Sequence, residues 1–158
     1  MKRVLIISIL VVVVVAATMI LINQSNPKEE FVNVKVFFNN TNLDPEFSCN
    51  KVFPVERRVS KTNELERTAI SELLNGPTQG EVEQGFLTSI NSGVRINKLS
   101  IVRGKAMIDF DERLEFQVGG SCRVAAISAQ IRETLKQFPY VKEVIISIND
   151  RTEDILQP

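Results

Sequence analysis

The first part of the chain beyond residue 30 alternates apolar and polar residues, which is the period of a half-buried strand. The apolar positions of this segment are Val32, Val34, Val36 and Phe38. A second alternating segment follows a turn-rich loop and places on one face Phe53, Val55 and Val59. Pro54 has no N–H to donate to a ladder, which predicts that this second strand lies at a sheet edge. We expect the two strands to form a long hairpin.

Two later segments show the three-to-four-residue spacing of amphipathic helices. The apolar stripe of the first consists of Leu65, Ala69, Ile70, Leu73 and Leu74. Asn63, with Glu66 three residues later, resembles a capping pair at its start. The second helix is predicted to begin near Ser121 and to end before Pro139. Its stripe consists of Val124, Ile127, Ser128, Ile131, Leu135 and Phe138.

Three further strands complete the pattern. Residues 94–102 and 105–110 flank Arg103-Gly104, which predicts a tight hairpin. A slip in the apolar spacing after Ile96 indicates a bulge in the first of these strands. The last strand, residues 141–148, follows the second helix, and a right-handed crossover is expected if it lies parallel to a neighbouring strand. The predicted fold is α+β, order ββαββαβ, with two helices packed on one face of a mixed β-sheet.

The N-terminal segment is interpreted separately because residues 4–22 contain no charge. At 1.5 Å per residue this run spans about 28 Å, close to the hydrocarbon thickness of a bilayer. The run continues past its small residues and no cysteine follows it closely, so we predict an uncleaved signal anchor over residues 1–22, with a removed signal peptide as the alternative. Lys2 and Arg3 favour a cytoplasmic N-terminus. Residues 23–31 form a polar tether to an extracytoplasmic domain of a single-pass membrane protein.

The charge balance argues against two kinds of partner. The chain has 19 basic and 19 acidic residues; without Lys2 and Arg3, 17 basic residues face 19 acidic ones, a net charge of −2. A nucleic-acid-binding domain carries a basic surplus, so nucleic acid is not an expected partner. Anionic lipid headgroups are also unexpected, because no basic cluster follows the apolar segment. The remaining chain is long enough for one domain with its own core.

Two cysteines, Cys49 and Cys122, fall on the predicted outer side of the membrane. In an oxidising compartment, a lone pair far apart in sequence most often forms a disulfide. Closing a loop of this length stabilises a fold by about 4 kcal/mol in the chain-entropy model. We therefore predict a Cys49–Cys122 disulfide. The alternative is that both are buried free cysteines that act as small apolar residues.

The segment from Leu73 to Gly85 is rich in glycine and could be a phosphate-binding loop or only the end of a helix. A phosphate loop needs N–H groups at the start of a helix, usually with a lysine nearby. Here the first glycine follows a helix, and the next charged residues are Glu81 and Glu83, which repel an anion. Gly76 suits the left-handed position that ends a helix, and Pro77 cannot continue one. The pattern favours a helix stop followed by a loop without regular structure, and no cofactor is expected.

Candidate catalytic residues are few because the chain has no histidine. This excludes a catalytic triad of the usual kind and most zinc sites. Four carboxylates do lie close in sequence, namely Asp109, Asp111, Glu112 and Glu115. Asp109 and Asp111 are two residues apart on a strand, as a hydrolase or calcium site requires. The pattern is also typical of a solvated strand end, which we favour. Ser121 after two glycines is interpreted as a helix cap and not as a nucleophile.

Three segments together resemble a known domain family. They are "AISELLNGPT" (69–78), "GFLTSINSGVRINKLSIVRGKAMIDF" (85–110) and "AAISAQIRETLKQFPYVKEVIISIND" (125–150). In order and spacing they are similar to the GerMN domain of sporulation and spore-germination proteins. The chain departs from the family at Asn91 and Val94, which stand where the turn usually has proline and threonine.

The resemblance covers residues 32–150, nearly the whole outer part, and leaves a tail at 151–158. It implies one copy of a non-catalytic, extracytoplasmic module, similar in fold to small ring-building motifs, that works through envelope proteins of unknown identity or through self-association. The alternative is a cell-wall hydrolase or carbohydrate-binding module that uses Asp109, Asp111 and Glu112. Two surfaces are expected to contact a partner: the exposed side of the first helix and the segment after it, residues 76–85. The residues of that segment proposed for the contact are Gly76, Pro77, Thr78, Gln79, Gly80, Glu81 and Glu83. The alternative is that this segment is a plain connector.

Overall fold

The computed structural model of the chain describes residues 13–16, 18–19, 29–46 and 48–157. The chain divides into two units, residues 1–30 and 31–158, and each is described by itself. In the first unit, residues 13–16 and 18–19 are helical. No helix among the described residues is long and apolar enough to cross a membrane. Most of the predicted signal anchor lies outside the described residues.

The first two strands form the predicted long hairpin. β1 (Phe31–Asn40) pairs antiparallel with β2 (Phe53–Ser60) from Phe31 to Phe38. The far end of β1 also pairs with the two-residue strand β3 (Phe86–Leu87), which gives the sheet order β2-β1-β3. β2 is therefore an edge strand, as Pro54 predicted.

The remaining strands form a second sheet of order β4-β5-β6. β4 (Ile96–Val102) pairs antiparallel with β5 (Lys105–Phe110), and β5 pairs parallel with β6 (Glu143–Ile148). The register shifts between Ile96 and Lys98, which confirms the predicted bulge. Arg103 and Gly104 both have positive φ, the combination of a type I′ hairpin turn.

The prediction of a single mixed sheet is therefore wrong: the strands form two three-stranded sheets. The inner faces of both sheets nevertheless contribute to one apolar core, with Val36 and Phe38 from β1 and Ile108 and Phe110 from β5 among its buried members. Apolar alternation fixes which face of a strand is buried but not which strand lies beside it. Two separate sheets that share one core therefore produce the same alternating sequence pattern as a single sheet.

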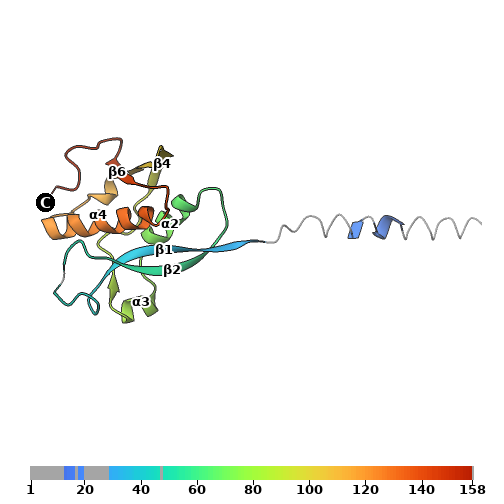
Figure 1. The fold of residues 1–158 in the computed structure, drawn as a ribbon, viewed down its shortest axis with the longest axis horizontal. Helices are drawn as coiled ribbons and strands as arrows, with labels where there is room; N and C mark the ends of the chain where they lie inside the picture. Colours follow the sequence, from blue (N-terminus) through green and yellow to red (C-terminus); the bar gives the residue numbers. More distant parts are fainter. Residues whose placement is uncertain (1–12, 17, 20–28, 47, 158) are drawn as a thin grey trace, which may run out of the picture. The chain divides into compact units, whose positions relative to one another are not determined.

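Two main helices cover this core. α2 (Leu65–Leu74) contacts β1 and α4 (Ser121–Lys136), while α4 contacts both β1 and β6. Figure 1 shows α4 between the β1–β2 hairpin and the β6 region. Both predicted apolar stripes are confirmed, because their central residues are fully buried, namely Ala69, Ile70, Leu73, Ile127, Ile131 and Leu135. A 3-10 turn, η1 (Glu112–Leu114), joins β5 to the segment before α4.

The predicted helix starts need correction. The N-cap of α2 is Glu64, and its side chain makes no capping hydrogen bond. Glu66 does not cap the helix and instead accepts a hydrogen bond from the Tyr140 hydroxyl. The N-cap of α4 is Gly120 with φ +86°, so Ser121 is the first helical residue and not the cap. A glycine at this position adopts a backbone conformation that serine rarely adopts.

A buried polar chain that the sequence did not indicate joins α4 to β1. Gln130 on α4 is fully buried, and its Nε2 donates to Asn39 Oδ1 at 2.8 Å. Its Oε1 accepts from the Thr88 hydroxyl at 2.8 Å. Asn39 Nδ2 in turn donates to the carbonyl of Lys51 at 2.9 Å, in the loop that carries Cys49. Each buried polar group is therefore satisfied, which is the condition for placing amides in a core.

Candidate functional site

The segment after α2 is more ordered than the sequence predicted. Gly76 has φ +77°, which confirms the helix stop, but residues 79–83 form a short helix, α3 (Gln79–Glu83). The expectation of a loop without regular structure is therefore wrong. Thr78 and Glu81 form a capping box: the Thr78 N–H donates to Glu81 Oε2 at 2.8 Å, and the Glu81 N–H donates to Thr78 Oγ1 at 3.4 Å. The Thr-x-x-Glu spacing is the signal that could have predicted this helix.

Arg57 on β2 holds α3 through the Glu81 carboxylate. Its Nη2 donates to Glu81 Oε2 at 2.6 Å, and its Nη1 donates to Glu81 Oε1. Both side chains are mostly buried, and Glu72 on α2 lies 3.7 Å from Arg57 Nε. Partial burial acts to raise the pKa of Glu81, but hydrogen bonds from Arg57 and Thr78 outweigh it and lower the pKa. Glu81 is consequently a structural anchor and not a free group for a partner.

The other end of α3 is fixed to the end of β1. Asn40 and Asn42 donate through Nδ2 to the carbonyl of Gln84 at 3.1 and 3.0 Å, and the Thr41 N–H donates to the Gly85 carbonyl at 3.0 Å. Gly85 has φ +88°, and a Cβ there would lie 2.8 Å from Asn42 Nδ2. Any other residue here would be strained by the positive φ and would displace the side chain of Asn42.

These anchors leave a defined group of side chains in solvent. Among the predicted surface residues, Thr78, Gln79, Gly80 and Glu83 are exposed, whereas Gly76, Pro77 and Glu81 are half-buried. Sequence reasoning missed Val82, an apolar side chain that is 50% exposed. We call Gln79, Gly80, Val82 and Glu83 the α3 surface. It holds an apolar side chain within a polar rim on a fixed backbone, which suits contact with another protein.

The sequence predicted that Asp109 lies at a solvated strand end, and this prediction is wrong. In the structure Asp109 is buried. Its Oδ1 accepts from the Ser147 hydroxyl at 2.7 Å and from the Asp150 N–H at 2.8 Å, and its Oδ2 accepts from Asn97 Nδ2 at 2.9 Å. Burial acts to raise its pKa, but these hydrogen bonds together with nearby Lys98 lower the pKa below its ordinary value. Asp109 thus joins β4, β5 and the turn after β6.

The other three carboxylates of the cluster have partners of their own. Asp111, also buried, accepts from the N–H and from Nε of Arg95, each at 3.1 Å. Glu112 accepts from Asn149 at 3.2 Å, and Glu115 accepts from Arg151. In the described part of the chain, no group of three or more acidic or cysteine side chains is placed to hold a metal ion. Asp109 and Asp111 therefore act at separate positions and not as a pair.

The outer face of the second sheet is the place where the alternative carbohydrate or hydrolase site would lie. A hollow of about 260 Å³ there is lined by Asp109, Asp150, Met107, Ile145 and polar side chains of Lys98, Ser100, Ser147 and Thr152. No aromatic ring lines it, and sugars are usually bound by stacking on such a ring. Both carboxylate oxygens of Asp109 already accept hydrogen bonds from the protein.

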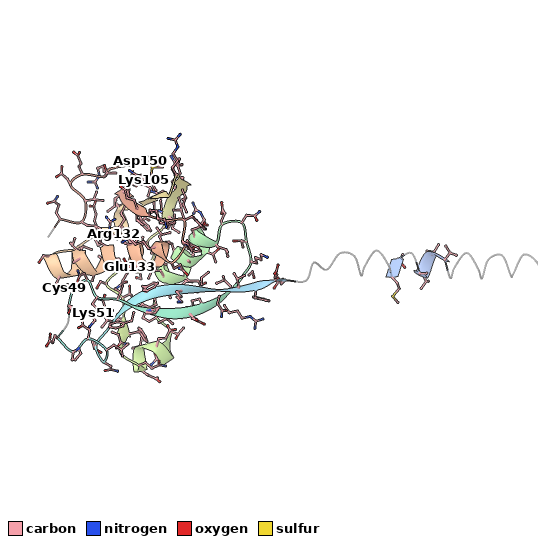
Figure 2. The ribbon with its side chains drawn as sticks, viewed as in Figure 1. Cys49, Lys51, Lys105, Arg132, Glu133 and Asp150 are labelled. Atoms are coloured by element: carbon pink, nitrogen blue, oxygen red, sulfur yellow. A yellow bond between two sulfur atoms is a disulfide. The ribbon has the colours of Figure 1, made fainter. Side chains whose placement is uncertain are left out.

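The predicted disulfide is confirmed. Cys49 and Cys122 are bonded, with their Cα atoms 4.9 Å apart and a sequence separation of 73. Figure 2 shows Cys49 beside the first turn of α4. The bond fixes the loop between β1 and β2 to the N-terminal end of α4.

Asn91, one of the two departures from the family turn, connects three segments. Its Nδ2 donates to the carbonyls of Arg113 and Phe116 at 2.7 and 2.8 Å, and its Oδ1 accepts from Arg123 Nη2 at 2.7 Å. Arg123 also donates to the Gln117 carbonyl at 3.1 Å. The asparagine thus anchors η1 to α4, whereas proline has no side-chain group that could make these bonds.

Comparisons with known proteins agree with this geometry. Residues 35–154 match the family model described as "Germane: Sporulation and spore germination". No curated protein sequence matches the chain. Among solved structures, the tandem GerMN domains of the sporulation protein GerM from Bacillus subtilis align with a TM-score of 0.62 at 24% identity, over 80% of this chain and 42% of that one.

Two further structures share the fold. The first GerMN domain of GerM from Bacillus subtilis aligns with a TM-score of 0.56 at 20% identity, over 77% of this chain and 85% of that one. A Clostridium perfringens protein aligns with a TM-score of 0.51 at 16% identity, over 84% and 85% of the two chains. The chain spans less than half of the tandem structure, which contains two domains where this chain has one.

Proposed function

Because the chain belongs to the Germane family of sporulation and spore germination domains, we propose that it is a non-catalytic scaffold that binds other proteins outside the cytoplasmic membrane. In this proposal the N-terminal apolar segment anchors a single-pass protein with its N-terminus in the cytoplasm. The partners are envelope proteins, with self-association as one form of assembly. The proposal does not require that the source organism forms spores.

The observation that carries this proposal is the rigid support of the α3 surface. Five residues of helix are fixed by a capping box, by the Arg57–Glu81 ion pair and by two asparagine contacts to the Gln84 carbonyl. A short surface segment held from both sides presents its exposed residues in one geometry, which lowers the conformational cost of binding. Val82 supplies an apolar contact at its centre.

The alternative of a wall hydrolase or carbohydrate-binding module is supported by fewer observations. It depends on Asp109 and Asp111, which are engaged in separate internal contacts. Under the scaffold proposal, Asp111→Asn does not change the binding of the chain to wall fragments. Under the alternative, it abolishes that binding or an associated hydrolysis.

A photo-crosslinking residue at Gln79 tests the proposal in cells that express the whole chain. Gln79 is exposed on α3, and its side chain donates a hydrogen bond to Glu83 Oε1 at 3.2 Å, four residues later. The matched control places the same residue at Lys136, which is exposed at the end of α4. Adducts to an envelope protein or to the chain itself, formed at Gln79 and not at Lys136, support the scaffold. Equal adducts at both positions, or none at Gln79 in a folded and displayed chain, refute it.

A further inference from the structure

The free edge of β4 differs from the outer edges of β2 and β6. β2 has Pro54 and charged side chains, which block pairing with a further strand. The outer edge of β6 is used by Arg132, which donates to the Val144 carbonyl, and by the bridge from Ile148 to Arg151. In the described part of the chain, by contrast, no backbone hydrogen bond joins β4 to any strand other than β5.

The turn at the end of β4 defines which of its backbone groups are free. In a two-residue type I′ hairpin, the flanking residues Val102 and Lys105 form a hydrogen-bonded pair, and such pairs alternate along the ladder. The N–H and C=O groups of Leu99 and Ile101 therefore point away from β5. They form a row of donors and acceptors that an added strand can pair with.

A groove runs beside this edge, between β4 and α2. One hollow, about 160 Å³, lies against Leu99, Ser100 and Ile101. A second, about 390 Å³, lies against Val94, Arg95 and Ile96. Arg67 lines both hollows, so the two hollows are neighbours along α2. Arg67 and Ser71 of α2 form the wall opposite β4, with Asn63 before the helix and Asn75 after it.

The charges in the groove differ between its two ends. The hollow beside Ile96 is lined by two arginines, Arg67 and Arg95, and by no acidic residue. Arg95 pairs through Nε with Asp111, but its side chain is 80% exposed. The hollow beside Ile101 contains Glu64 and Glu66 in addition to Arg67. Arg67 Nε lies 3.8 Å from Glu64 Oε2, and Glu66 accepts a hydrogen bond from the Tyr140 hydroxyl. Arg95 is therefore the most exposed positive charge at the start of β4, and the 75% exposed carboxylate of Glu64 is the most exposed negative charge toward its end.

We propose that the groove between β4 and α2 binds an extended peptide segment of a partner protein, which adds to the sheet as a strand antiparallel to β4. Its carboxyl end carries a negative charge toward Arg95, and its amino end carries a positive charge toward the exposed carboxylate of Glu64. The direction follows because the basic end of the groove lies at the start of β4. Backbone pairing supplies affinity, and the helix wall and the charges supply specificity.

The groove between β4 and α2 is lined by none of the residues of the α3 surface. The result of the crosslinking experiment at Gln79 therefore does not decide whether the groove binds a peptide. Selection from a phage-displayed library of random octapeptides with free carboxyl termini, on the full-length chain in detergent, provides the probe. We expect enriched peptides that combine β-branched residues at alternate positions with an acidic carboxyl end. Absence of enrichment contradicts the proposal.

Two tests on a selected peptide decide how it binds. Ser71 is exposed on the groove wall, so Ser71→Trp fills the groove and is expected to weaken binding at least tenfold, while Lys136→Trp on α4 leaves binding unchanged. Single N-methylation of peptide residues that face β4 is expected to weaken binding at least tenfold, and methylation of the intervening residues has little effect. Thermal melts of both variants confirm that they remain folded. Binding that is indifferent to Ser71→Trp, or to the position of the methyl group, overturns the proposal.

Discussion

The ion pair between Arg57 and Glu81 provides the sharpest test of how α3 is held. Glu81→Gln keeps the size of the side chain and an oxygen that can accept the Thr78 N–H, but it removes the charge that faces Arg57. The structure shows both Arg57 Nη atoms directed at this carboxylate, one at 2.6 Å, with both side chains mostly buried. Losing charge-assisted hydrogen bonds of this kind is expected to cost about 1 to 2 kcal/mol of unfolding free energy.

The assay is urea denaturation at pH 7 of the wild type, Glu81→Gln, Arg57→Leu and the double variant. A double-mutant cycle isolates the interaction from the separate contact between Arg57 and Glu72. We expect a coupling energy of about 1 kcal/mol. A coupling near zero means that Arg57 does not hold α3, and it would refute the structural basis of the proposed surface.

The pH dependence supplies a second check on the same pair. The pKa of Glu81 is lower in the folded state than its ordinary value of 4.5. Its stabilising contribution is therefore fully present above the unfolded-state pKa and is lost as the pH falls through the folded-state pKa. The difference in stability between the wild type and Glu81→Gln should shrink on acidification from pH 7 to below 4.5. A difference that stays constant over this range contradicts the assignment.

Three further changes test other parts of the structure. Gly85→Ala should destabilise the domain by about 1 to 3 kcal/mol because of its positive φ and the crowding by Asn42, as measured by urea denaturation; an unchanged midpoint contradicts this. Replacing Cys49 and Cys122 together by serine should cost roughly 4 kcal/mol, whereas wild-type-like stability would show that the bond does not constrain the unfolded chain. Asp109→Asn should lower the free energy of unfolding by about 1 to 3 kcal/mol at pH 7. This loss should become smaller as the pH falls through the lowered pKa of Asp109. Asp150→Asn, at an exposed position, is the control.

The sequence predicts the elements of this fold well because their signals are local. The alternation in β1, the stripe of α4 and the Arg103-Gly104 turn each depend on residues a few positions apart. The separation into two sheets does not have such a signal. It depends on which strands lie side by side, and the strand that completes the first sheet, β3, has only two residues and pairs with the polar end of β1.

The burial of Asp109 could not be predicted for a related reason. Its partners, Asn97, Ser147 and Asp150, come from two other segments that are distant in sequence and meet only in the folded domain. When the contacts between these segments are not known, an aspartate at an outward-facing position of a strand is best interpreted as solvated. The fully buried Gln130 was missed in the same way, because its partners Asn39 and Thr88 are also distant in sequence.

The central claim, that the α3 surface binds another protein, is tested most directly by quantitative co-purification. Val82 is exposed and belongs to neither the capping box nor the ion pair, so Val82→Arg changes the surface and leaves the supports of α3 in place. The unchanged chain, Val82→Arg and the control Lys136→Glu are isolated at equal amounts from detergent-solubilised cells, and bound proteins are quantified by mass spectrometry. The account predicts at least one partner that is depleted tenfold or more by Val82→Arg and retained by Lys136→Glu. The same set of bound proteins from all three chains would contradict it.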